Sequence, residues 1–168
     1  MSSVAAAATV PTSMPSISRD ADGARRPRPA TLHRTVAAIL DHHDALRSHL
    51  PADGQELMVE PAGSVSAYSA VTYVRTDCVP GNAQFDAVLD AECRAAADRL
   101  DTAAGVMLQL VWIDPVDARG VLLVVAHHLV VDGVSWRILV PDFATAWAQV
   151  AADRTPELPP VARGPPLA

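Results

Sequence analysis

The sequence predicts an α+β domain, a mixed α/β sandwich, and three observations support this prediction. A length of 168 residues suits one domain, or one domain with a tail. Hydrophobic residues make up 50% of the chain and charged residues 19%, so a packed core can form. The elements expected from apolar periodicity follow the order helix, strand, helix, strand, strand, helix, which is typical of helices packed on a sheet.

Only the middle of the chain carries regular patterning. Residues 1–30 are rich in Ala, Ser, Thr and Pro and show neither a helical nor a strand period, so we expect a disordered low-complexity tail. Residues 156–168 contain five prolines and predict a Pro-rich tail or linker. The folded part is therefore expected to span residues 31–155.

The first expected helix has an apolar stripe at steps of three, four and seven residues, and Pro51 and Gly54 end it. This stripe consists of Leu32, Val36, Ile39, Leu40, His43 and Leu50. A run rich in Val, Ser, Tyr and Thr at residues 65–74 predicts a strand. Residues 85–100 predict a second helix, because their apolar side chains again share one face.

Two apolar runs, residues 106–113 and 121–126, predict an antiparallel hairpin because the turn-forming sequence DPVDARG lies between them. Neither run alternates cleanly, so both faces of these strands should be covered. A third helix is expected over residues 133–151. Pro141 inside it cannot donate to the carbonyl of Arg137, which costs about 3 kcal/mol, so we expect a kink or short break at residues 140–141.

Composition argues against several classes of protein. Thirteen basic and nineteen acidic side chains give a net charge of −6, which argues against a nucleic-acid-binding surface. The longest strongly apolar run falls far short of the about 20 residues of a membrane-spanning helix, so no membrane association is expected. No Lys or Arg precedes Arg19, so no secretory signal is expected. Cys78 and Cys93 are too few for a disulfide framework, which favours a reduced, cytoplasmic setting.

The segment AHHLVVDGVSWRIL, residues 126–139, could carry chemistry. If the preceding strand persists, His127 and His128 point to opposite faces, so only one of them can face a cleft. A histidine facing a cleft can act as a general base, because its proton moves most easily near neutral pH. Asp132 precedes the third helix, where a carboxylate can cap free N–H groups or hold an arginine. Gly133 leaves room for a close approach of backbone or ligand.

Plainer interpretations of these residues remain open. The two histidines could be satisfied polar groups, and Asp132 could be an ordinary helix cap. A zinc site from His127, His128 and Asp132 is disfavoured because adjacent strand histidines diverge. A triad with Ser135 is also disfavoured, because this serine lacks a nucleophile-elbow context.

A second group of potential ligands, His42, His43 and Asp44, lies on the first expected helix. There His43 falls on the core stripe, whereas His42 and Asp44 point elsewhere. We therefore expect no metal site from these three residues, and no metal elsewhere.

The string HHLVVDG, residues 127–133, has the form His-His-x-x-x-Asp-Gly and resembles the signature of the condensation-domain superfamily of nonribosomal peptide synthetases. The continuation VSWRILVPDFATAW looks most like the epimerisation branch, whose marker corresponds to Ser135 and Trp136 here. Upstream, HHDALRSHL is similar to the family's early motif with Asp/Glu-x-Leu-Arg. The resemblance covers about residues 31–161 and implies a chloramphenicol acetyltransferase-like fold.

The resemblance implies a role for each matching residue. His128 would face the tunnel and move the α-proton of an aminoacyl or peptidyl thioester held on the phosphopantetheine arm of a carrier protein. In the condensing branch it would instead assist the attack of an amine on such a thioester. His127 would be a buried structural histidine, and Gly133 would also be structural. Asp132 would pair with an arginine, and Arg47 stands at the matching position.

Family members have two similar lobes with the active site between them, and the resemblance here is to the N-terminal lobe, incomplete at both ends. The expected first strand before Thr31 and the whole second lobe are missing, so we expect the chain to be inactive alone. Three functions stay open: a lobe of an epimerisation domain, which the Ser135-Trp136 pair favours; a lobe of an amide- or ester-forming condensation domain; and a catalytically silent remnant or split subunit. Implied partners are a peptidyl or acyl carrier protein, and a second lobe or adjacent synthetase modules. No cofactor is expected to bind directly, and the substrate amino acid is not indicated.

Overall fold

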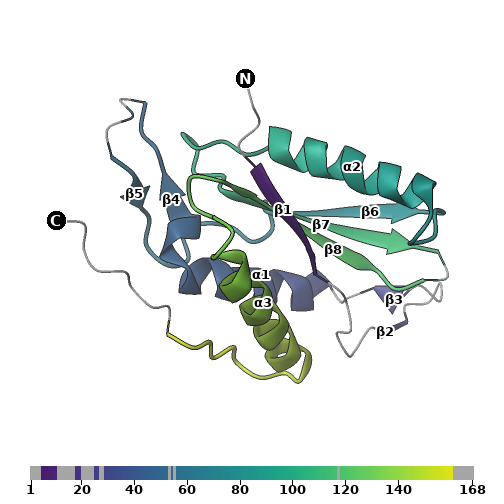
Figure 1. The fold of residues 1–168 in the computed structure, drawn as a ribbon. Helices are drawn as coiled ribbons and strands as arrows, with labels where there is room; N and C mark the ends of the chain where they lie inside the picture. Colours follow the sequence, from purple (N-terminus) through teal and green to yellow (C-terminus); the bar gives the residue numbers. More distant parts are fainter. Residues whose placement is uncertain are drawn as a thin grey trace.

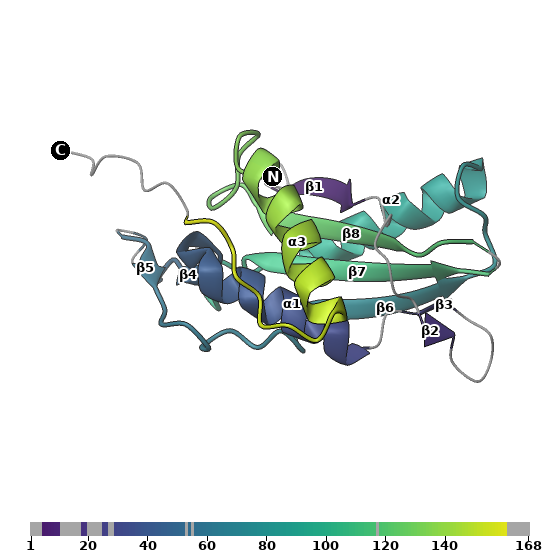
Figure 2. The ribbon, with the colours of Figure 1, turned by 90° about the horizontal axis from the view of Figure 1, so that it is seen from below.

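The computed structural model describes residues 5–10, 18–19, 25–26, 29–52, 54, 56–116 and 118–160. These residues include a four-stranded sheet with the strand order β1-β8-β7-β6. Helix α2 (Ala83–Asp98) covers one face of the sheet, while α1 (Pro29–His42) and α3 (Trp136–Ala151) lie on the other (Figure 1 and Figure 2). This three-layer arrangement is the α+β sandwich predicted from the order of the elements.

The predicted hairpin forms the centre of the sheet. Strands β7 (Leu108–Pro115) and β8 (Val121–His127) pair antiparallel, with Leu108 opposite Ala126. Strand β6 (Val71–Thr76) lies parallel to β7, and α2 forms the connection between them. Side chains on both faces of β7 and β8 are buried, which confirms that helices cover both sides.

The core consists of two apolar clusters, one on each face of the sheet. The larger cluster lies between the sheet and helices α1 and α3, and it contains Trp112 and Trp147, whose rings stack with centroids 6.3 Å apart. The smaller cluster lies beneath α2 and includes Phe85. Each fully buried side chain of this size contributes about 1.5–3 kcal/mol to folding, so the larger cluster dominates the stability.

The first helix is shorter than its apolar stripe predicts. It ends at His42 and is followed by the short helix η1 (Asp44–Arg47) and strand β4 (Ser48–His49). Strand β4 pairs with β5 (Met58–Val59), so Leu50 is not helical and the long predicted helix is corrected here.

Arg47 explains why α1 ends where it does. Its guanidinium donates to the carbonyl oxygens of Leu40 at 2.5 Å and Asp41 at 2.8 Å, and to the carbonyl of Glu60 at 2.9 Å. The last carbonyls of a helix have no partner within the helix, and a positive charge near them is favourable. The Arg47 side chain therefore caps the C-terminal end of α1 and ties it to the chain that follows β5.

Two further expectations are corrected by the structure. The strand predicted at residues 65–74 is β6 (Val71–Thr76), because residues 67–70 form turns before it. Helix α3 runs without a break through Pro141, against the expected kink or break at residues 140–141. The carbonyl of Arg137 that loses its donor belongs to an exposed residue, so water can satisfy it.

Part of the expected N-terminal tail has regular structure. Strand β1 (Ala5–Val10) pairs antiparallel with β8, with Ala5 opposite His127 and Val10 opposite Leu122. Two short strands, β2 (Ser18–Arg19) and β3 (Arg25–Arg26), pair with each other. The prediction of no order therefore fails for these segments, because strand pairing uses main-chain groups that composition does not report. The rest of residues 1–28 lies outside the described residues.

The start of the Pro-rich C-terminal segment runs along the helices (Figure 2). The side-chain amide of Gln149 exchanges two hydrogen bonds with the main chain of Glu157, at 2.7 and 3.1 Å. The ring of His42 lies 2.8 Å from the carbonyl oxygen of Pro159, and Leu158 packs on the larger cluster. Residues 156–160 are thus held against α1 and α3, and residues 161–168 lie outside the described residues.

Candidate functional site

The His-His-x-x-x-Asp-Gly signature occupies the connection between β8 and α3. Strand β8 ends at His127, residues 128–130 form a turn, and α3 begins at Trp136. Val131 is buried in the larger cluster and anchors the middle of this connection, which we call the signature loop (residues 128–135). The sheet and the core therefore fix both ends and the centre of the loop.

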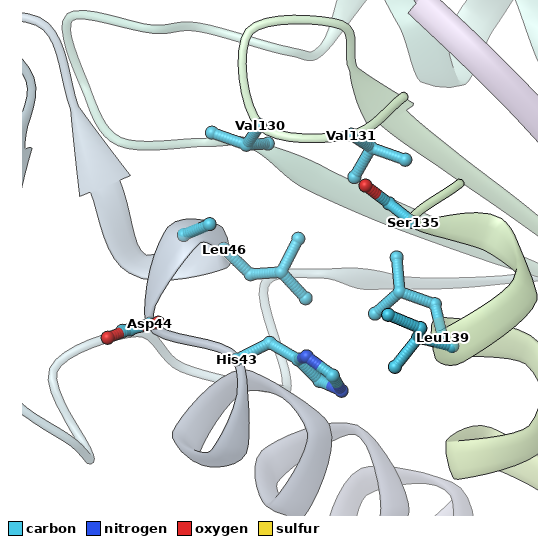
Figure 3. Close-up of a pocket in the computed structure, with 9 residues that line it drawn as sticks. His43, Asp44, Leu46, Val130, Val131, Ser135 and Leu139 are labelled. Atoms are coloured by element: carbon cyan, nitrogen blue, oxygen red, sulfur yellow. The ribbon is translucent and has the colours of Figure 1, made fainter. Parts of the chain in front are cut away.

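A pocket of about 130 Å³ lies beside the signature loop. The loop and α3 form one wall and the end of α1 with η1 the other. The ring of His43, which lies between α1 and η1, points toward α3 (Figure 3). Its lining consists of His43, Asp44, Ala45, Leu46, Val130, Val131, Ser135, Ile138 and Leu139. Most of these side chains are apolar, so the pocket suits an apolar group with a small polar end.

The two signature histidines differ in exposure and in hydrogen bonding. His127 is half-buried, and its Nδ1 accepts a hydrogen bond from the main-chain N–H of Leu129 at 3.1 Å. His128 is exposed in the turn, and its side chain has no hydrogen bond or ion pair with any residue that the structure describes. His127 was expected to be buried, but the strand ends there and leaves it partly open. His128 lies beyond the end of β8, so the strand does not hold the two side chains on opposite faces as predicted.

Asp132 holds the signature loop in its conformation through hydrogen bonds within the loop. Its Oδ1 accepts hydrogen bonds from the N–H groups of Val134 at 3.0 Å and Ser135 at 2.8 Å, and from the Ser135 hydroxyl at 2.7 Å. These bonds, led by that from the Ser135 side chain, lower the pKa of Asp132 from its usual value. The carboxylate therefore closes the turn that leads into α3.

The predicted pairing of Asp132 with Arg47 does not occur. Asp132 is exposed, and its carboxylate is bonded to its own loop. Arg47 is buried at the end of α1 and donates to three main-chain carbonyls. Each group thus has nearer partners, and we correct the expected ion pair to two separate caps.

Gly133, Ser135 and Trp136 complete the signature segment. Gly133 is exposed, and a Cβ placed on it would meet nothing within 4 Å. Ser135 bonds to Asp132 and contributes to the pocket wall. Trp136, half-buried, opens α3 and packs on the larger cluster. His128 is not among the described residues that line the pocket.

Sequence analysis did not predict the buried contact between His43, which lines the pocket, and Asp142. The Nε2 of His43 lies 3.0 Å from Oδ2 of Asp142 on α3, and both side chains are 9% exposed. Burial lowers the pKa of His43, and the neighbouring Asp142 carboxylate opposes this only in part. The two residues are 99 positions apart, so no local spacing could have predicted their contact.

No described helix is long and apolar enough to cross a membrane.

A family model described as "Condensation domain" matches residues 25–163 of the chain. Among curated proteins, surfactin synthase subunit 1 of Bacillus subtilis (strain 168) is 34% identical over 132 residues, which cover 78% of this chain. Tyrocidine synthase 1 of Brevibacillus parabrevis is 27% identical over 132 residues, which also cover 78% of this chain.

Solved structures with the same fold include the epimerization domain from the third module of tyrocidine synthetase B. The TM-score is 0.69 at 23% identity, over 96% of this chain and 33% of that one. The X-domain from teicoplanin biosynthesis, solved in complex with OxyB, has a TM-score of 0.64 at 24% identity, over 82% of this chain and 28% of that one. These likenesses confirm the predicted chloramphenicol acetyltransferase-like fold class.

The chain belongs to the condensation-domain family, because the family model covers most of its length. This confirms the family resemblance inferred from the signature. The chain spans only 4% of the length of surfactin synthase subunit 1 and 12% of that of tyrocidine synthase 1.

Proposed function

We propose that this chain contributes an acid–base histidine, His128, to the epimerisation of an aminoacyl or peptidyl thioester on a carrier protein. The observation that carries the proposal is the contrast within the histidine pair. His127 is engaged by the main chain of its own loop, whereas His128 is exposed and has no partner among the described residues. An imidazole without a protein partner is available to take a proton from a substrate.

The chemistry asks for one proton transfer in each direction. The imidazole of His128 removes the α-proton, and the electron pair of the C–H bond passes into the thioester carbonyl as an enolate. A second acid, which the remainder of the domain would supply, then donates a proton to the opposite face of the α-carbon and inverts its configuration, while the His128 imidazolium releases its proton to solvent. A base with a pKa near neutral pH suits this step when it is held in position. Strand β8 and the Asp132 turn hold the two ends of the loop that carries His128.

The substrate would arrive on a phosphopantetheine arm, so the proposed partner is a peptidyl or acyl carrier protein, with further synthetase modules beside it. No cofactor bound directly by this chain is part of the proposal. We place the protein in the cytoplasm, where the free thiols of Cys78 and Cys93 would remain reduced.

A second candidate is amide or ester formation, in which His128 assists an amine or hydroxyl that attacks the thioester. The family model favours it by its description, Condensation domain. The Ser135–Trp136 pair favours epimerisation. In the structure this pair places a serine on the Asp132 turn and a tryptophan at the start of α3.

A product assay separates the two candidates. The chain is mixed with an L-aminoacyl carrier protein and with the remainder of a related epimerisation domain as a separate polypeptide. Appearance of the D-aminoacyl thioester supports epimerisation. Amide formation on addition of an aminoacyl acceptor, without inversion, supports condensation instead. Absence of both products contradicts both proposals and favours a silent chain.

A further inference from the structure

Two segments that are far apart in the sequence, the end of α1 and the middle of α3, bring together a group of potential metal ligands. His42 ends α1, His43 follows it, and Asp142 lies on α3. One potential ligand atom from each of the three lies within 4.8 Å of the others. The carbonyl oxygen of Pro159, from the C-terminal segment, lies 2.8 Å from Nε2 of His42.

The charge balance at this group favours a cation. The Asp142 side chain is only 9% exposed, and the one partner of its carboxylate among the described residues is His43. Only Oδ2 of the carboxylate has a partner among the described residues, so Oδ1 remains available as a ligand atom. A buried carboxylate is costly unless its oxygens are fully hydrogen-bonded or a positive charge lies beside it.

We propose that His42, His43 and Asp142 bind a divalent transition-metal ion such as zinc. Two imidazoles and one carboxylate form a donor set that suits Zn²⁺ and Co²⁺. A fourth ligand could be water or the Pro159 carbonyl, which already lies beside His42. The inference concerns a site separate from the signature histidines and does not depend on the proposed reaction.

The geometry needs only small movements to accept the ion. Two ligand atoms bound at about 2.0–2.2 Å to a tetrahedral ion lie about 3.3 Å apart. Nε2 of His43 and Oδ2 of Asp142 are already 3.0 Å apart, so this pair has to open by a few tenths of an ångström. The ligand atom of His42, within 4.8 Å of the other two, has to move closer to them, and its ring is only half-buried at the helix end.

The bound ion would act as a structural clamp. His43 lines the pocket beside the signature loop, and Asp142 lies in the second turn of the helix that follows this loop. A metal bridge between α1 and α3 would therefore fix the helix that the signature loop leads into. Since both sides of the bridge already pack together, the ion would add rigidity to an existing contact.

The second histidine pair provides an internal control. His127 and His128 are also adjacent, but no carboxylate joins them in a cluster among the described residues. The Oδ1 atom of Asp132 already accepts three hydrogen bonds within its own loop. If two adjacent histidines were sufficient to bind the ion, His127 and His128 would bind it as well as His42 and His43 do.

The test is Co²⁺ and Zn²⁺ binding to the full chain after treatment with EDTA, followed by visible absorption and calorimetry. We expect one ion per chain, with Co²⁺ bands typical of low coordination. His42→Ala is the main variant, because His42 is half-buried and its hydrogen bond with Pro159 is at the edge of the fold. It should weaken binding more than about tenfold, because even the loss of a residue that only hydrogen-bonds a metal ligand costs about 10–100-fold in affinity. The double variant His127→Ala/His128→Ala should bind as the wild type does.

Asp142→Asn provides a second variant that preserves the side-chain shape, with circular dichroism to confirm the fold. It should weaken binding by at least the same factor, because the amide carries no charge. Absence of a stoichiometric site in the wild type would overturn the proposal. So would unchanged binding by folded His42→Ala or Asp142→Asn protein, or loss of binding in the His127/His128 double variant.

Discussion

Replacement of Arg47 by alanine should destabilise the fold strongly, because one guanidinium satisfies three main-chain carbonyls. The residue is 8% exposed and donates to Leu40, Asp41 and Glu60 at 2.5, 2.8 and 2.9 Å. The contact with the Leu40 carbonyl is buried, so its loss costs about 1–3 kcal/mol, and the two partly buried contacts cost about 1 kcal/mol each. The free energy of unfolding should therefore fall by about 3–5 kcal/mol.

Urea unfolding followed by circular dichroism measures this loss. Arg47→Lys serves as the matched control, because lysine keeps the charge but cannot reach three carbonyls at once, so it should recover only part of the stability. A loss below about 1 kcal/mol for Arg47→Ala would refute the capping argument. The double variant with Asp132→Asn separates the two caps: their effects should add, and clear non-additivity would mean that Asp132 and Arg47 form a pair after all.

Two further predictions concern the signature loop and the core. Because the folded-state pKa of Asp132 is lowered, its stabilising bonds should be complete above the ordinary aspartate pKa and lost as the pH falls through the folded value. An NMR titration of the Ser135 amide tests this, and a transition above the ordinary aspartate range would contradict it. Gly120→Ala should cost about 1–3 kcal/mol, because the new Cβ would lie 2.2 Å from the buried Trp112 ring. Gly133→Ala, which meets no atom within 4 Å, should leave thermal stability unchanged, and equal losses in both variants would count against this packing argument.

The sequence predicted those helices and strands whose formation depends on residues close together in the chain. The β7–β8 hairpin was predictable because two apolar runs flank a turn-forming segment, and α2 because its apolar face repeats along a single helix. The end of α1 was not predictable in this way. It is set by Arg47 folding back onto carbonyls six and seven residues earlier, while the apolar stripe continues past the end. Strand β1 escaped prediction because its pairing with β8 joins residues more than 100 positions apart.

The same distinction between local patterns and contacts of distant residues applies to the candidate site. The signature loop was recognisable because its motif is contiguous, and its place between β8 and α3 follows from the flanking patterns. The predicted pairing of Asp132 with Arg47 was wrong, because each side chain is hydrogen-bonded to main-chain groups near it in the sequence. The His43–Asp142 contact was missed, because it depends on how α1 and α3 pack together.

In the proposed reaction His128, and not its neighbour His127, moves the α-proton. The direct measurement is deuterium incorporation at the α-carbon of a carrier-bound aminoacyl thioester in D₂O, with the remainder of a related domain supplied. His128→Ala should lower the exchange rate by at least about 10²-fold, the usual contribution of a general base. His127→Ala, in which only a local loop bond is lost, should keep most of the activity. Wild-type exchange in the His128→Ala protein, or its loss only in His127→Ala, would contradict the assignment.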